Sequence, residues 1–294
     1  MRAILRQPAA WLRPTVAMTR AQAILLLVLA GLTAGAWALT VYQVHAMPMP
    51  MGFGVRGAPS GAGSSADGMG GMAMAGLTGG DWSLAAALTF LLVWTVMMAA
   101  MMLPAIAPLL LLFGSIHAKR QPRGHALVPT WVFAAGYLLV WAATGALVYV
   151  LVQAGRDWAG ALSPVRRDAW APLALGATLV GAGLYQLTPL KRVCLGQCQS
   201  PLGFLMGHWR DGWRGALRMG MQHGLYCLGC CWALFAVLVA SGLMSLAWMA
   251  LLTLVIFAEK VVPHGQRTAA AVGLVLVALG VLVAAGSTAL PWVA

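Results

Sequence analysis

Long apolar runs separated by short polar segments dominate this chain. A run of about 20 apolar residues is long enough to cross a lipid bilayer as a helix. The sequence predicts seven such helices, at residues 21–42, 83–113, 128–153, 169–188, 218–241, 243–262 and 268–290. The expected fold is therefore all-α, a polytopic membrane helix bundle of about seven transmembrane helices.

The composition supports this fold and excludes several classes of protein. Of the 294 residues, 61% are hydrophobic and 8% are charged, whereas ordinary soluble domains have about 45–50% and about 25%. These values exclude a soluble globular enzyme and a disordered chain. The 35 glycines and 13 tryptophans are typical of closely packed membrane helices with interfacial anchors.

The net charge of +12 is explained by topology, so no nucleic-acid partner is expected. Arg56, Arg156, Arg166 and Arg167 lie on one side of the predicted membrane, and the remaining Lys and Arg of the 18 lie on the other or at its boundary. The positive-inside rule then places the N-terminus inside and the C-terminus outside. The expected location is a bacterial inner membrane.

The N-terminal run has a second interpretation. Basic residues, an apolar run and Ala36-Trp37-Ala38 also occur in cleaved signal peptides, which would leave six helices. The apolar run continues beyond this triplet, which favours an uncleaved anchor. The expected organisation is a basic N-terminus and first anchor at 1–42, a flexible Gly- and Met-rich extracytoplasmic loop at 43–81, and a six-helix bundle at 82–294 that carries the metal-binding motifs.

Sulfur and imidazole gather on one face of the fifth predicted helix. At 100° per residue, Met219, His223, Cys227 and Cys230 fall within an arc of about 80°, with Cys231 beside them. Thiolates and thioethers are soft ligands that select Cu(I), and thiolate with imidazole also suits Zn(II). The alternative is that these cysteines are small apolar residues that fill the core.

Glu259 is the only acidic residue in the predicted helices. The fifth and sixth helices are joined by a tight turn, and counting from it places Glu259 near the depth of His223. We therefore expect Glu259 to orient this imidazole or to bind the metal directly. The alternative is an interfacial carboxylate neutralised by Lys260.

Two further groups of sulfur atoms precede this face. Met97, Met98, Met101 and Met102 form i, i+4 pairs near the depth of the cysteines, either as metal ligands or as adaptable core packing. Pro104 and Pro108 predict a kink just beyond them. Cys194 and Cys198 lie in a basic loop on the cytoplasmic side, either as ligands or as unrelated thiols.

The extracytoplasmic loop also carries two clusters of methionine thioethers. The first is Met47, Met49 and Met51 together with His45, and the second is Met69, Met72 and Met74. Together with the sulfur atoms at mid-membrane and on the inside, these residues resemble a relay for a soft cation. A low-complexity linker explains the loop equally well.

Several blocks of the chain resemble a bacterial family of predicted metal-binding integral membrane proteins of unknown function. The matching blocks are MMAAMMLP at 97–104, LYQLTPLKRVCLGQCQSP at 184–201, HGLYCLGCCW at 223–232, SGLMSLAWM at 241–249 and AEKVVPHG at 258–265. The resemblance covers about residues 85–265 and implies a metal-binding membrane bundle. It supports the four methionines, five cysteines and Glu259 as motif residues.

Three functions follow from these features. The first is Cu(I) handling or transport by Met and Cys ligand exchange, with a copper chaperone or a copper-receiving protein as partner. The second is a membrane thiol-disulfide oxidoreductase, and the third is a zinc-binding or metal-free assembly factor. Predicted thiols inside or within the bilayer argue against the enzyme. The sequence leaves the metal, the direction of transport and the oligomeric state open.

Overall fold

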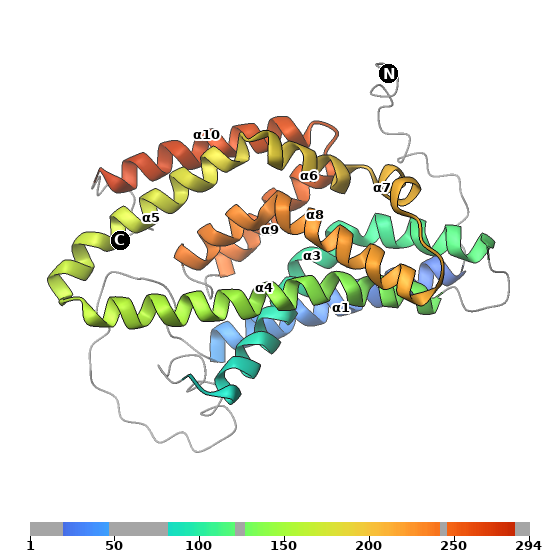
Figure 1. Ribbon diagram of the computed structural model, residues 1–294, viewed down its shortest axis with the longest axis horizontal. Coiled ribbons are helices and arrows are strands. Elements are labelled where there is room, and N and C mark those ends of the chain that lie inside the picture. Colours follow the sequence, from blue (N-terminus) through green and yellow to red (C-terminus); the bar gives the residue numbers. More distant parts are fainter. Residues whose placement is uncertain (1–19, 47–81, 121–126, 242–245, 286–294) are drawn as a thin grey trace.

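The computed structural model describes residues 20–46, 82–120, 127–241 and 246–285, and all regular structure within these ranges is helical (Figure 1). The helices are α1 (Arg20–Ala46), α3 (Leu84–Arg120), α4 (Leu127–Ala161), α5 (Pro164–Gln186), α6 (Pro189–Gln199), α7 (Pro201–His208), α8 (Gly212–Ser241), α9 (Leu246–Val261) and α10 (Gly265–Ala284). Each of the seven predicted segments overlaps one helix, with ends that differ by up to eight residues, which confirms the all-α prediction.

Within the described ranges, five helices are long and apolar enough to cross a membrane: α1, α3, α4, α8 and α10. The pair α5 and α6 forms a sixth candidate if the two count as one broken span. The seventh, α9, has 16 residues, or about 24 Å of helix, which is shorter than a bilayer core of about 30 Å. Many large apolar side chains are exposed, among them Leu27, Leu84 and Leu254, as expected of a surface that faces lipid.

The bundle is held together by close helix pairs. Helix α5 packs along α10, and α4 packs along α8 (Figure 1). Gly220 and Gly224 of α8 face α4, where a Cβ on Gly220 would overlap the carbonyl oxygen of Phe133 and one on Gly224 would lie 3.1 Å from Val140. These glycines, one helical turn apart, therefore allow α4 to approach α8 closely.

The sequence predicts a loop between the fourth and fifth predicted helices, and this prediction is wrong. The segment forms two short helices, α6 and α7. Thr188 caps α6 by accepting a hydrogen bond from the backbone N–H of Lys191 at 3.3 Å, and Pro189 occupies its first turn. Pro201 likewise occupies the first turn of α7, but the N-cap residue Ser200 makes no side-chain capping hydrogen bond. The axes of α5 and α6 differ by 65°, so α6 turns back against α8 and α9.

Helix α3 is continuous across Pro104 and Pro108. Most of the predicted extracytoplasmic loop lies outside the described residues, including Met47, Met49, Met51, Met69, Met72 and Met74. The described helices therefore position the inner sulfur clusters and leave the outer relay untested.

Candidate metal centre

The buried face of α8 is the one that the sequence predicts. Met219, His223, Cys227, Cys230 and Cys231 are all buried. The α-helical period places them together, and close packing against α4 and α6 covers them.

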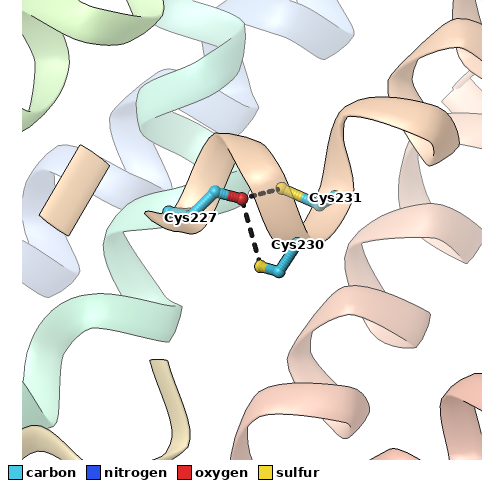
Figure 2. Close-up of side chains that lie close together, drawn as sticks. All are labelled: Cys227, Cys230 and Cys231. Atoms are coloured by element: carbon cyan, nitrogen blue, oxygen red, sulfur yellow. Dashed lines mark hydrogen bonds between the residues drawn. The ribbon is translucent and has the colours of Figure 1, made fainter. Parts of the chain in front are cut away.

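Three of these side chains lie close enough to share one metal ion. The Sγ atoms of Cys227, Cys230 and Cys231 all lie within 4.8 Å of one another. Figure 2 shows them on one turn of α8, with the thiols of Cys230 and Cys231 donating hydrogen bonds to the Cys227 carbonyl at 3.1 and 2.8 Å. All five cysteines of the chain are free thiols in this structure.

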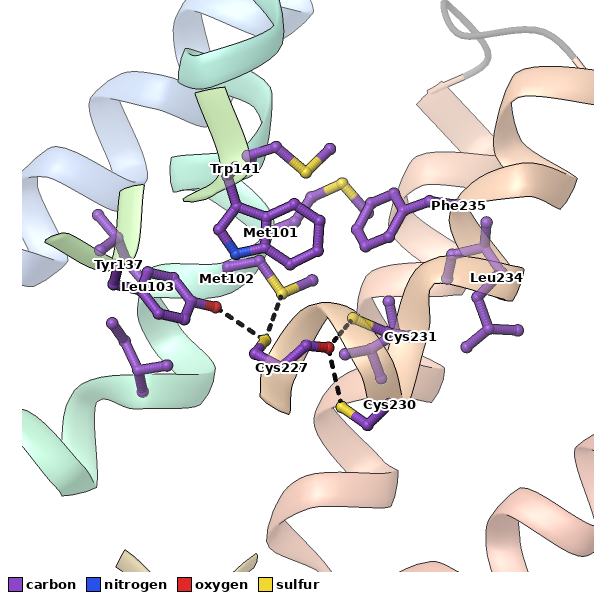
Figure 3. Packing of buried hydrophobic residues seen from close by; sticks show 14 of the residues in the cluster. Met101, Met102, Leu103, Tyr137, Trp141, Cys227, Cys230, Cys231, Leu234 and Phe235 are labelled. Carbon is purple, nitrogen blue, oxygen red and sulfur yellow. Dashed lines mark hydrogen bonds between the residues drawn. The ribbon is translucent and has the colours of Figure 1, made fainter. Parts of the chain in front are cut away.

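Cys227 is the most connected member of the cluster. Its Sγ lies 3.0 Å from the hydroxyl of Tyr137 on α4, 3.9 Å from Sδ of Met102 on α3, and 3.0 Å from Nζ of Lys260 on α9. Figure 3 shows Tyr137 and Met102 directed at this sulfur from two different helices. Four helices thus meet at one thiol, which fixes its position in the bundle.

Helix α6 brings a fourth thiol close to the three-thiol cluster. Cys198 Sγ lies 3.8 Å from Cys230 Sγ. Cys194 lies one turn earlier on α6, against Gly229, where an added Cβ would approach its Sγ to 2.8 Å. Both α6 cysteines are partly exposed, whereas Cys230 is buried. The sulfur atoms therefore form a series from a half-buried helix into the core.

All four methionines of the predicted ridge lie in the apolar core, and one of them also contacts a thiol. Met97, Met98, Met101 and Met102 are all buried. Met102 contacts Cys227 and also lies 3.6 Å from Nζ of Lys260. Met101 belongs to the same cluster of buried hydrophobic residues as Trp141 and Phe235 (Figure 3), and so do the other three methionines.

The expected contact between Glu259 and His223 is wrong. The two side-chain oxygens of Glu259 accept hydrogen bonds from Lys191 Nζ at 2.7 Å and from Gln186 Nε2 at 3.1 Å. The ion pair of Glu259 is with Lys191 and not with the neighbouring Lys260, whose Nζ lies 3.0 Å from Cys227 Sγ. Helix rotation explains the error, since counting from the turn gives the depth of a residue but not the direction of its side chain.

His223 lies one turn from Cys227 in an aromatic environment. Its ring packs against Phe204 at 4.8 Å, Tyr137 at 6.0 Å and Phe133 at 6.3 Å between ring centres. Its Nδ1 atom is buried without a hydrogen-bond partner among the described residues. The imidazole therefore retains a nitrogen free to accept a ligand or proton.

The sequence did not predict a role at the site for Tyr137 or Lys191. It also did not predict that Lys260 contacts a sulfur atom. The available signal was Lys260 at the end of the apolar helix α9, because an ammonium buried there requires a partner. Lys191 is 1% exposed and Lys260 is 8% exposed. Tyr137 carried no signal distinguishable from core packing.

The comparisons with known proteins agree with this chemistry. No curated protein matches the chain, and neither does any solved structure. The model of the PpoB2 family, described as a copper chaperone, matches residues 91–283. The match covers more than half of the chain and includes α8 with its three cysteines, Met102, α6 and Lys260, so this protein belongs to the PpoB2 copper chaperone family.

Proposed function

We propose that this protein binds Cu(I) as cargo at a site formed by Cys227, Cys230 and Cys231 with Met102, and passes it on by ligand exchange. The observation that carries the proposal is the three-thiol cluster, whose Sγ atoms lie within 4.8 Å of one another, with a thioether 3.9 Å from one of them. Thiolate and thioether donors select Cu(I) among the metals available in cells. The site is buried in apolar surroundings, which excludes competing water ligands.

The route to this site begins on α6. Cys198 is partly exposed and lies 3.8 Å from Cys230, so a copper ion can pass between two- and three-coordinate sulfur sites without leaving sulfur. Cys194, one turn away, extends the series outward. A copper chaperone or copper-receiving protein would exchange the ion here, and His223 offers a further donor one turn from Cys227.

In the membrane we place the N-terminus and α6 inside and the C-terminus outside, by the positive-inside rule. The organisation is an anchor at 1–42, an extracytoplasmic loop at 43–81 and a bundle at 82–294, in a bacterial inner membrane. The thioethers between Met47 and Met74 would then capture or release Cu(I) on the opposite face. Transport is the outcome if both ends exchange copper with the buried site.

The test is the metal content of the full-length protein, purified in detergent after expression with copper and zinc both supplied. We expect about one copper per chain, lost when Cys227, Cys230 and Cys231 are changed together to Ser. Met219→Leu is the matched control, because Met219 is fully buried on the same face of α8 but lies two turns from Cys227. Zinc in place of copper, lost in the same variant, would instead support a structural zinc-binding assembly factor.

A second function, thiol-disulfide exchange, is favoured by one specific contact. Cys198 and Cys230 have their Sγ atoms 3.8 Å apart on two helices, a separation that a small shift converts to a disulfide. Mass spectrometry of the alkylated protein, taken from cells with and without copper, tests it. A Cys198–Cys230 disulfide that forms and disappears with redox state, in protein free of metal, would favour the oxidoreductase.

A further inference from the structure

Lys260 places a positive charge inside the sulfur cluster. Its Nζ lies 3.0 Å from Sγ of Cys227 and 3.6 Å from Sδ of Met102. The side chain is 8% exposed and comes from α9, a different helix from either partner. Both of its hydrogen-bond acceptors are therefore sulfur atoms of the site proposed above.

The nearest carboxylate does not balance this charge, because another lysine occupies it. Glu259 is the only acidic residue of the predicted spans, and its carboxylate is engaged by Lys191 at 2.7 Å and by Gln186. Lys191 and Glu259 together are neutral. The ammonium of Lys260 remains, and an unbalanced charge buried this deeply is strongly destabilising.

A thiolate at Cys227 supplies the missing negative charge. The N–H groups of Lys260 point at this sulfur, and hydrogen bonds of this kind around a metal stabilise thiolate ligands and hold them in place. Cu(I) bound by the cluster carries a net charge of minus one when two of the three thiols are ionised. With the ammonium beside it, the loaded site is neutral, as a site in hydrocarbon must be.

We propose that Lys260 is the counter-charge of the copper site, a positioning residue that allows an anionic copper bis-thiolate to form within the bundle. This inference rests on the proposed function, because it assumes that the cluster binds Cu(I). It predicts that the charge of Lys260 determines the affinity of the site. A lysine that merely blocked the cluster would have the opposite effect, since its removal would tighten binding.

The expected effect is large. A unit charge about 4 Å away in a medium of effective dielectric constant about 20 changes an equilibrium by up to roughly a thousandfold. Removing the ammonium also removes its own desolvation, so we expect Lys260→Met to weaken Cu(I) binding by at least about 30-fold. Lys260→Arg keeps the charge and should restore affinity to within about tenfold.

The experiment measures the Cu(I) affinity of full-length protein in detergent by competition with a chromogenic Cu(I) chelator. Lys260→Gln serves as a second uncharged variant should Lys260→Met fail to fold. The control is Lys191→Met with Glu259→Gln, which removes the other buried lysine together with its counter-ion, and Cu(I) affinity should change by less than about threefold.

The Cu(I) affinities of these variants support or overturn the role of Lys260 as counter-charge. Weaker binding in both uncharged variants, with recovery in Lys260→Arg, supports the counter-charge. Unchanged or tighter binding in the uncharged variants overturns it and leaves the copper site intact. Equal weakening in the Lys191/Glu259 control also overturns it, because the effect would then come from loss of any buried lysine. Wild-type protein that fails to take Cu(I) overturns the proposed function and this inference together.

Discussion

Met102→Leu separates the two interpretations of the methionine ridge, metal ligand and core packing. Met102 is fully buried, and its Sδ lies 3.9 Å from Cys227 Sγ. Leucine has nearly the same volume, so exchange of one for the other should lower the free energy of unfolding by less than about 1.5 kcal/mol. The thioether, however, is lost completely.

The loss of affinity can be bounded from below. Removing a group that only supports a metal ligand costs about 10–100-fold in metal affinity. Met102 is proposed as a ligand itself, so its removal should weaken Cu(I) binding by at least about tenfold, or about 1.4 kcal/mol. Copper bound by the three cysteines would keep three sulfur neighbours in place of four.

Met101→Leu is the matched control. Met101 lies one residue away on α3 and is 1% exposed, and it belongs to the same cluster of buried hydrophobic residues as Trp141 and Phe235 (Figure 3). Competition with a Cu(I) chelator gives the affinity of each variant, and X-ray absorption at the copper edge gives the number of sulfur neighbours. Equal affinities for the two variants, with unchanged coordination, would remove Met102 from the site and return the whole ridge to core packing.

Three further predictions address packing, charge and exchange. Gly220→Ala should lower the free energy of unfolding by about 1–3 kcal/mol, because the added Cβ overlaps a carbonyl oxygen of α4. Gly224→Ala should change the free energy of unfolding by less than about 1 kcal/mol. Equal effects of the two substitutions on thermal unfolding in detergent would contradict the α4–α8 contact. Lys191→Met should lower the free energy of unfolding by about 3–5 kcal/mol because it leaves Glu259 unpaired, and adding Glu259→Gln should restore most of this loss. Denaturant unfolding curves in which the double variant is no more stable than Lys191→Met would argue against the ion pair. Cys198→Ser should slow Cu(I) transfer to a chelator by about tenfold or more while changing equilibrium affinity by less than about threefold, and stopped-flow rates equal to wild type would exclude α6 from the route.

The sequence was sufficient for the seven apolar helices and for the buried face of α8. Apolar runs of membrane length identify helices because the bilayer leaves no other way to satisfy the backbone. The 100° period then places Cys227 and Cys230 on one face, which the structure buries. The close approach of α4 at Gly220 was predictable for the same reason, since small residues one turn apart form a groove.

The broken span was less accessible to prediction. The residues from 189 to 208 are more polar and carry basic residues, which favoured a loop. The signals for helices were present nevertheless, because Thr188-Pro189 and Ser200-Pro201 each pair a capping residue with proline at the first helical position. Reading them would have placed Cys194 and Cys198 on one helix but could not have shown that this helix turns back onto α8.

The partners of the charged residues depend on rotation about the helix axis, which sequence periodicity leaves undetermined for a helix apolar on all sides. Glu259 and Lys260 are neighbours in the chain, so their side chains project about 100° apart and face different elements. One meets Lys191 of α6, and the other meets Cys227 of α8. Among the described residues of this region, two lysines and one carboxylate leave Lys260 without a carboxylate partner, and its Nζ instead lies 3.0 Å from Cys227 Sγ. The proposed anionic copper site therefore rests on an excess of buried lysine over buried carboxylate around the sulfur cluster.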